Sequence, residues 1–252
     1  MWELYDRLID GINEEITITH AVIGKVWTAI KATDKNGKIY GGMCMTVLGH
    51  NPNFDISNKV IGKTLKQVAG YSKSWNFSEA SIGVAAINAF YNTREKALAQ
   101  NGIVDGLKQN DAFETAKKEV VGKNVAVIGH FPFLERLKDI CNLMILERKP
   151  LEGDYPDSAC EYILPDCDYV YITGVTLINK TLPRLLQICK NAKVHLVGPS
   201  VSLAPFMFEY GVDVLDGSII GDIDKTLLEV GDGNKRLLFG KDLAQMITIN
   251  KE

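Results

Sequence analysis

The stretch VAVIGHFPFL, residues 125–134, decides the fold. Its first four residues are apolar and largely β-branched, which is typical of a buried strand. Gly129 allows a sharp turn, and Pro132 suits the first turn of a helix, where its missing N–H costs nothing. The free N–H groups at such a helix start can hold an anion or an oxygen-rich group. We therefore expect a strand, a turn and a helix over about 132–141. The candidate ligand contacts at the turn are Gly129, His130 and Phe131.

Strand-like and helix-like segments alternate through the chain after about residue 101. The strand-like runs are 125–129, 142–147, 169–173, 193–197 and 212–215. Helical patterns cover about 111–121, 132–141 and 181–190. Strands that are almost continuously apolar and alternate with helices predict a parallel sheet covered on both faces. We expect a Rossmann-like, doubly wound α/β domain over residues 101–252.

The first part of the chain follows another pattern. An amphipathic helix opens it, and the segment 16–32 is rich in β-branched residues. Asn36-Gly37 is a strong tight-turn signal, and a returning strand follows at about 38–48. Helices come next, including the alanine-rich segment 78–91, for which Ser78 suits the N-cap. The pattern predicts a separate α+β domain over residues 1–100.

Polar or small residues stand at the end of each predicted strand of the second domain. In an open parallel sheet, ligands bind outside the carboxyl ends of the strands, near the point where the strand order reverses. Beyond the first turn, the residues at these ends are Glu147, Arg148, Thr173, Gly174, Gly198, Pro199, Ser200, Asp216 and Gly217. Asn179 and Thr181 precede a helix, and Thr181 can also be a simple cap. Asn88, in the alanine-rich helix, is either a structural bridge or a contribution from the first domain.

His130 and Glu147 are the candidates for specific chemistry. His130 has three interpretations: a structural histidine, an acid–base or binding group, or a metal ligand. Glu147 lies 18 residues after Gly129 (147 − 129), near the spacing of about 20 residues at which a carboxylate binds ribose in dinucleotide sites. The G-x-G-x-x-G pattern is absent. If their strands are neighbours, about 4.8 Å apart, His130 and Glu147 can converge on a divalent ion.

Composition limits the classes of function. The net charge of −3 argues against a general nucleic-acid or membrane-surface binder. The five cysteines are widely spaced without a C-x-x-C pair, which favours a reducing, cytoplasmic setting. We interpret them as buried small hydrophobic residues rather than as a thiolate metal site. No apolar run approaches the roughly 20 residues that span a bilayer, and a homo-oligomer is compatible with the sequence.

Several segments together resemble a known family, the "putative heavy-metal chelation" proteins, which is a domain of unknown function. The segments are SIGVAAINA (81–89), VIGHFP (127–132), LERKP (146–150), ILPDCDYVYITG (163–174), NKT (179–181) and LVGPS (196–200). The resemblance implies a first domain like the small N-terminal domain of enolases, a Rossmann-like second domain, and a site between them. It does not imply enolase chemistry, because the barrel that supplies the enolase metal and base groups is lacking.

Three functions remain open from the sequence. The first is a ligand-binding protein with an interdomain site, for metal chelation or for handling a metal-chelating small molecule. The second is an enzyme that uses a nucleotide-like cofactor, S-adenosylmethionine or NAD, in the same crevice. The third is an assembly module without a ligand, which predicts a large exposed apolar patch. The sequence does not decide whether the chain is an enzyme.

Overall fold

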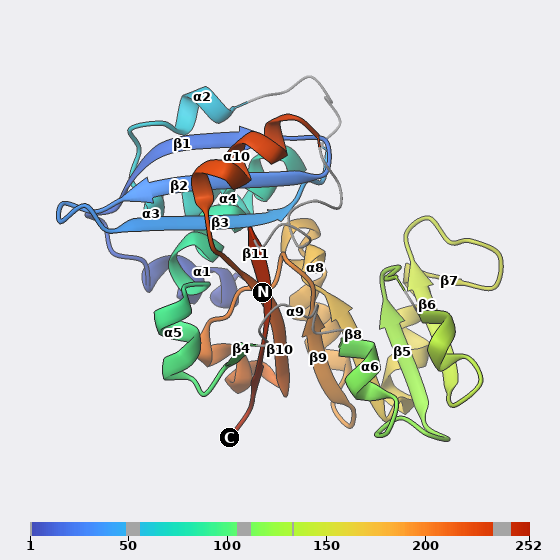
Figure 1. Ribbon diagram of the computed structural model, residues 1–252. Helices are drawn as coiled ribbons and strands as arrows, with labels where there is room; N and C mark the ends of the chain where they lie inside the picture. The colour runs from blue at the N-terminus through green and yellow to red at the C-terminus, as the bar shows by residue number, and fades with distance from the viewer. Residues whose placement is uncertain (1, 49–55, 105–111, 133, 234–242) are drawn as a thin grey trace.

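The computed structural model describes residues 2–48, 56–104, 112–132, 134–233 and 243–252, which form two β-sheets covered by helices (Figure 1). A three-stranded antiparallel sheet has the order β1-β2-β3. An eight-stranded, mostly parallel sheet has the order β4-β11-β10-β9-β8-β5-β6-β7. This arrangement confirms the expected fold class, with an antiparallel sheet first and a covered parallel sheet after it.

The first sheet is formed by β1 (Thr17–Ile23), β2 (Trp27–Thr33) and β3 (Ile39–Met45). The segment 16–32 forms most of two strands, because the chain reverses after Ile23, where the Gly24 N–H donates to the Trp27 carbonyl at 2.8 Å. The predicted turn before β3 is confirmed, because Gly37 has φ +80° and the Asp34 carboxylate accepts from two backbone N–H groups of the turn.

Two helices cover opposite faces of the first sheet (Figure 1). On one face lies α4 (Phe77–Tyr91), whose small side chains allow close approach: a Cβ at Gly42 would stand 2.2 Å from Ala85 and Ala89 backbone atoms. Its N-cap is Asn76, not the expected Ser78, since the Asn76 side chain accepts from the Ser78 N–H. On the other face lies α10 (Ile223–Gly231), which comes from near the end of the chain.

Shorter helices complete the first part of the chain. These are α1 (Glu3–Asp10), α2 (Ser57–Val60), α3 (Leu65–Ala69), the 3₁₀-helix η1 (Gly70–Lys73) and α5 (Arg94–Ala99). The initial amphipathic helix is confirmed as α1, with Leu4, Tyr5 and Leu8 buried.

The second sheet contains every strand that the sequence predicts, and three more, but the last predicted strand extends to Ile220, so Asp216 and Gly217 lie within it rather than at its end. Its strands are β4 (Ile103–Val104), β5 (Asn124–Ile128), β6 (Asn142–Glu147), β7 (Tyr155–Pro156), β8 (Tyr169–Thr173), β9 (Lys193–Val197), β10 (Val214–Ile220) and β11 (Ala244–Asn250). The additional strands β4, β7 and β11 lie at or near the edges. The five predicted strands run parallel, with β5 between β6 and β8. The chain passes from β5 outward to β6 and then returns to β8 on the other side, so the strand order reverses at β5.

The helices of the second part are short. They are α6 (Ala112–Ala116), η2 (Leu134–Leu137), η3 (Asp157–Ala159), α7 (Cys160–Ile163), η4 (Leu164–Asp166), α8 (Val175–Asn179), α9 (Leu182–Ile188) and η5 (Pro205–Tyr210). The helix expected over 132–141 is only η2, where Leu134 and Leu137 are both buried at the three-residue spacing of a 3₁₀ turn. The helix expected over 111–121 is α6. Residues 111 and 133 lie outside the described residues.

Buried polar side chains link the two parts of the chain. Asn92, which is 4% exposed, donates to the carbonyls of Val201 and Ser218 at 2.8 and 3.1 Å and accepts from the Leu203 N–H at 2.8 Å. The Tyr5 hydroxyl, on α1, donates to the Leu177 carbonyl of α8 at 2.8 Å. One continuous apolar core extends from the first sheet to the second. The two parts of the chain are therefore packed as a single body.

Candidate functional site

A cavity of about 150 Å³ opens at the carboxyl ends of β5, β6 and β8, where the strand order reverses and where doubly wound sheets bind their ligands. Six of the residues predicted for the site line this cavity: Gly129, Glu147, Arg148, Thr173, Asn179 and Thr181. Its wall is completed by Ile128, Leu146, Asp157, Cys160, Val175, Thr176 and Leu185. The sequence thus located the cavity through the strand ends, although it did not predict all of its wall.

The turn after β5 depends on a glycine. Gly129 has φ +104°, and a Cβ at this position would lie 3.2 Å from the Thr173 side chain. The Phe131 ring lies beside the same point and beside Gly198, 3.7 Å from a Cβ built at either glycine. Phe131 packs on Phe113 of α6, with ring centroids 5.3 Å apart. The aromatic ring therefore occupies the α6 side of the strand ends, and the cavity lies on the other side.

Backbone N–H groups hold the Glu147 carboxylate at the cavity wall. One oxygen accepts from the His130 N–H at 3.3 Å, and the other accepts from the Arg148 and Lys149 N–H groups at 2.8 and 3.5 Å. The turn after β5 does use its backbone to hold an oxygen, as the sequence suggested, but in this structure the oxygen belongs to Glu147. The carboxylate is consequently fixed in position before any ligand arrives.

The imidazole of His130 pairs with Asp154 and not with Glu147. Its Nε2 lies 2.7 Å from Asp154 Oδ2, and 39% of the His130 side chain is exposed. The Asp154 side chain, only 5% exposed, also accepts from the Leu151 N–H at 2.8 Å. Burial opposes ionisation of Asp154, but the hydrogen bonds from Leu151 and His130 lower its pKa below the ordinary value. His130 and Glu147 therefore meet through the His130 backbone, while their side chains have separate partners.

Charges of both signs line the cavity. The Arg148 guanidinium lies 3.4 Å from the Asp157 carboxylate, and about half of each side chain is exposed. Glu147 adds a second carboxylate. Cys160 adds a thiol, and burial raises the pKa of that thiol to about 11, so it is protonated at neutral pH. The lining can contact an anionic group through Arg148 and a cationic centre through the two carboxylates.

The segment after β8 supplies hydroxyl and amide groups. Thr173 accepts from the Val175 N–H at 3.4 Å, and Thr176 donates to the Thr173 carbonyl at 2.7 Å. The side-chain oxygen of Asn179 accepts from both the N–H and the hydroxyl of Thr181. Lys180, between them, has φ +69°, a strained left-handed conformation for a residue with a side chain. The Asn179 amide nitrogen, by its chemistry, is a donor for a ligand oxygen.

The remaining predicted residues lie outside the cavity wall, and two of them, Ser200 and Asn88, link the two parts of the chain. Ser200 accepts from the Met45 N–H at 2.9 Å, and Asn88 donates to the carbonyls of Met43 and Pro199 at 3.0 and 3.4 Å. Gly174 allows close packing, since a Cβ there would stand 2.5 Å from the Val201 nitrogen. His130, Phe131, Gly198, Pro199, Ser200, Gly174 and Asn88 thus surround the strand ends without lining this cavity.

Sequence reasoning missed Asp157, Cys160 and Thr176. Asp157 and Cys160 belong to η3 and α7, which follow the two-residue strand β7. A strand of that length leaves no periodic pattern, so nothing in the sequence indicates that these residues lie at the strand ends. Cys160 was interpreted as a buried hydrophobe. It is buried, at 6% exposure, and it also lines the cavity.

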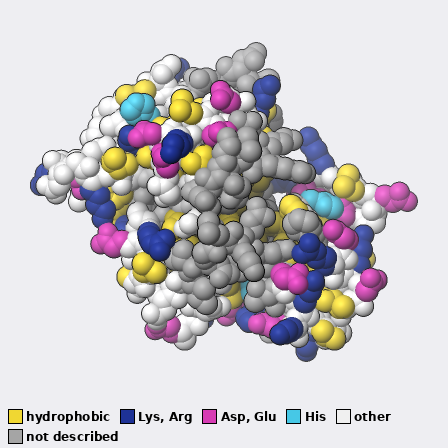
Figure 2. Space-filling view, in the orientation of Figure 1, with side chains coloured by type: hydrophobic (Ala, Val, Ile, Leu, Met, Phe, Trp, Pro, Cys, Tyr) yellow, Lys and Arg dark blue, Asp and Glu magenta, His cyan; other side chains and the backbone are white. Residues whose placement is uncertain are grey.

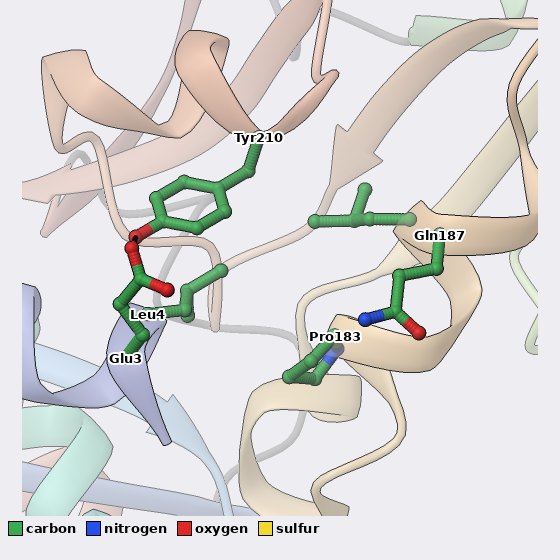
Figure 3. Close-up of a pocket in the computed structure, with 6 residues that line it drawn as sticks. Glu3, Leu4, Pro183, Gln187 and Tyr210 are labelled. Carbon is green, nitrogen blue, oxygen red and sulfur yellow. Dashed lines mark hydrogen bonds between the residues drawn. The ribbon is translucent and has the colours of Figure 1, made fainter. Parts of the chain in front are cut away.

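A second cavity of about 150 Å³ lies between α1, α9 and η5 (Figure 3). It is lined by Glu3, Leu4, Pro183, Leu186, Gln187 and Tyr210, and the Tyr210 hydroxyl donates to Glu3 at 3.3 Å. Its lining is largely apolar and includes no predicted site residue. We therefore regard it as a packing gap between the two parts of the chain.

Three features relate to the expected partners: the distribution of surface charge, the length of the helices and the grouping of metal-binding side chains. On the face shown in Figure 2, the basic and acidic side chains of the described residues are interspersed and form no extended region of one sign. Among the described residues, no helix has both the length and the apolar character to span a bilayer. In the same part of the chain, no three His, Cys, Asp or Glu side chains are grouped as a metal site.

Comparison with known proteins finds similarity along nearly the whole chain. Residues 5–91 and 111–249 match two family models, both described as "Putative heavy-metal chelation". An uncharacterized protein of Methanocaldococcus jannaschii is 32% identical over 221 residues, which cover 82% of this chain and 80% of that protein. A solved structure of a DUF364-family protein of unknown function from Desulfitobacterium hafniense DCB-2 is 42% identical, with a TM-score of 0.87 over 100% of this chain and 99% of the other. A second one, from Pyrococcus horikoshii, shares the fold at 21% identity, with a TM-score of 0.78 over 98% of each chain.

Proposed function

We propose, on the premise that the chain belongs to the family described as "Putative heavy-metal chelation", that it binds a small metal-chelate complex in the cavity at the ends of β5, β6 and β8. The metal is cargo and arrives with its chelating molecule. The observation that carries this proposal is the mixed lining of the cavity, in which Glu147 and Asp157 lie beside Arg148.

A bare heavy-metal ion does not fit the described residues. Soft metals prefer thiolates, but burial keeps the Cys160 thiol protonated by raising its pKa to about 11. The His130 imidazole is turned to Asp154 rather than to Glu147. Within the described part of the chain, no group of three metal-binding side chains is assembled. A metal would therefore need most of its ligands from elsewhere, and a chelating molecule supplies them.

A metal chelate carries both negative and positive charge, and the cavity lining has a partner for each. The carboxylates of a chelating molecule can accept from Arg148, the Asn179 amide and the Thr173 hydroxyl. The metal, where its coordination is incomplete, can be contacted by the Glu147 carboxylate, which the backbone already fixes. Because Glu147 is held before binding, little side-chain entropy is lost when the complex enters.

The size of the cavity favours a small ligand. About 150 Å³ is below the range of roughly 300–1,000 Å³ in which drug-sized ligands are bound. An S-adenosylmethionine or NAD cofactor is large for this space, and the family description gives no support to a nucleotide. The nucleotide-using enzyme is therefore not part of the proposal.

Native mass spectrometry of protein purified without chelators or a histidine tag tests the proposal, together with calorimetry using Zn²⁺, citrate and Zn²⁺–citrate as probes. We expect the chain to carry one metal plus a small organic mass, and to bind Zn²⁺–citrate more tightly than either component. Arg148→Gln should weaken binding about tenfold to a hundredfold, the effect of losing a charged hydrogen bond of about 1.5–3 kcal/mol. Glu147→Gln should weaken binding of the complex but not of citrate.

Arg184→Gln is the matched control, because Arg184 also pairs with an acidic residue, Glu161, on the surface but does not line the cavity. A metal retained without an organic partner, or Zn²⁺ alone binding as tightly as Zn²⁺–citrate, would contradict the proposal. A bare chain that also gives no heat with Zn²⁺–citrate would contradict it as well.

A further inference from the structure

The cavity at the ends of β5, β6 and β8 also has an apolar wall, which has no part in the contacts proposed above. Carboxylates and a metal are accounted for by the charged and hydrogen-bonding groups of the lining. The rest of the lining includes Ile128, Leu146, Cys160, Val175 and Leu185. A molecule that fills the cavity lies against these side chains as well, so they restrict the part of the ligand that binds neither Arg148 nor the metal.

The apolar residues of the lining belong to the continuous core of the protein. Ile128 and Leu146 are register partners at the ends of β5 and β6. Together with Cys160 and Leu185 they lie in the core cluster that extends from the first sheet to the second. This wall is therefore already formed in the free protein, and a ligand does not have to order it.

Cys160 belongs to the apolar wall rather than to the charged groups. It begins α7, and Leu185 lies on α9. Glu161 and Arg184, the next residues along the chain from Cys160 and before Leu185, form an ion pair of 2.6 Å that holds the two helices together. Burial raises the pKa of the Cys160 thiol to about 11, and a buried protonated thiol packs as a small hydrophobic group.

The charged and apolar parts of the lining differ in their exposure to solvent. The Arg148 and Asp157 side chains are 46% and 49% exposed, so they lie at the mouth of the cavity. Ile128, Cys160 and Leu185 are between 5% and 8% exposed, so they form its floor. A ligand in the cavity therefore has its charged groups near solvent and its opposite side against apolar side chains.

This division sets different free energies for different ligands. A charged group pressed on the floor would lose its water and find no hydrogen-bond partner there, which is strongly unfavourable. An alkyl group at the same place loses only unfavourable contact with water. A chelating molecule with charges on every side is thus a poorer match than one with an apolar side.

We propose that the chelating molecule is amphipathic: its metal-binding carboxylates face Arg148 at the mouth, and a short, uncharged alkyl group lies on the floor formed by Ile128, Cys160 and Leu185. This inference rests on the proposed function, because it names the class of molecule that the same cavity takes. The class is that of small carboxylate chelators with one aliphatic substituent. The substituent is short because the whole cavity measures only about 150 Å³.

Calorimetry with a series of zinc complexes tests the proposal on the intact protein. The chelators are iminodiacetate and its N-methyl, N-ethyl and N-propyl derivatives, which offer the metal the same nitrogen and two carboxylates and differ in the alkyl group. We expect the Kd of the complex to fall about fourfold for each added carbon that is buried on the floor. Zn²⁺–citrate, measured beside them, reports whether the cavity binds a chelate at all.

Two substitutions at Cys160 show whether the floor is responsible. Cys160→Ser places a hydroxyl on the floor and should reduce the gain from the propyl group about fivefold. Cys160→Ala keeps the floor apolar and should retain most of the gain. Cys189→Ser is the matched control, because Cys189 is also buried, at 5% exposure, but does not line the cavity, and its gain should equal that of the wild type.

The results that overturn the proposal differ from those that overturn the proposed function. If Zn²⁺–citrate or Zn²⁺–iminodiacetate binds but the Kd stays constant or rises along the alkyl series, the amphipathic ligand is wrong and chelate binding stands. An equal loss of the gain in Cys160→Ala and Cys160→Ser, or in Cys189→Ser, would likewise overturn the role of the floor. If none of these complexes binds, both proposals fall.

Discussion

Replacement of Asn92 by alanine should strongly destabilise the protein, because this side chain, at the end of α4, makes three buried hydrogen bonds to the second part of the chain. Its amide makes three hydrogen bonds of 2.8 to 3.1 Å to backbone groups of Val201, Leu203 and Ser218. The asparagine is 4% exposed, so water cannot easily replace it. Each buried backbone group left unpaired costs about 1–3 kcal/mol. Allowing for partial relaxation, we expect Asn92→Ala to lower the free energy of unfolding by about 3 kcal/mol.

Urea denaturation followed by circular dichroism measures this loss, provided that both proteins unfold in one transition with the same m-value. Asn13→Ala is the control, since the Asn13 side chain accepts one exposed hydrogen bond from the Glu15 N–H and should cost well under 1 kcal/mol. A loss of less than about 1 kcal/mol for Asn92→Ala would refute the conclusion that these three hydrogen bonds contribute strongly to stability.

Two further predictions concern the turn after β5 and its neighbour. Gly129→Ala should lower the free energy of unfolding by about 1–3 kcal/mol, because Gly129 has φ +104° and a Cβ would meet Thr173; an unchanged urea midpoint would contradict this strain. Asp154 has a lowered pKa in the folded state, so its contribution to stability is complete above its unfolded value of about 3.9 and is lost as the pH falls through the lowered folded value. Asp154→Asn should therefore make the free energy of unfolding depend less on pH in the acid range. Near pH 7 the pH dependence should be the same as in the wild type, and urea midpoints measured from acid to neutral pH will test both expectations.

The sequence was sufficient to predict the parts of the fold that depend on local pattern. The run 125–128 is apolar enough to be a buried strand, and the glycine and proline after it identify the turn. The same argument at the other strand ends brought Glu147 and Thr173 to one cavity. Strand ends can be predicted because hydrophobic runs stop there, and the edge of a parallel sheet then brings them together.

Long-range contacts account for what the sequence could not predict. The direction of the His130 imidazole depends on Asp154, 24 residues later, and no pattern connects the two. Cys160 reaches the cavity through a strand of two residues, which is too short to recognise. The helix expected after the turn is shortened to η2, although its residues are ordinary helix formers, and the local sequence does not explain the shortening.

The position of α10 has a consequence for the order in which the protein can form during synthesis. The outer face of the first sheet presents Trp27, Ala29 and Met43, and their covering residues, Ile223 and Leu227 among them, come from α10. A nascent chain that has just emerged past β3 therefore carries an uncovered apolar surface, and it keeps that surface until nearly all of the remaining sequence has been translated. The first sheet cannot be covered on this face until α10 has been translated. A chain interrupted before α10 would therefore expose an apolar surface that can bind chaperones or aggregate with other nascent chains.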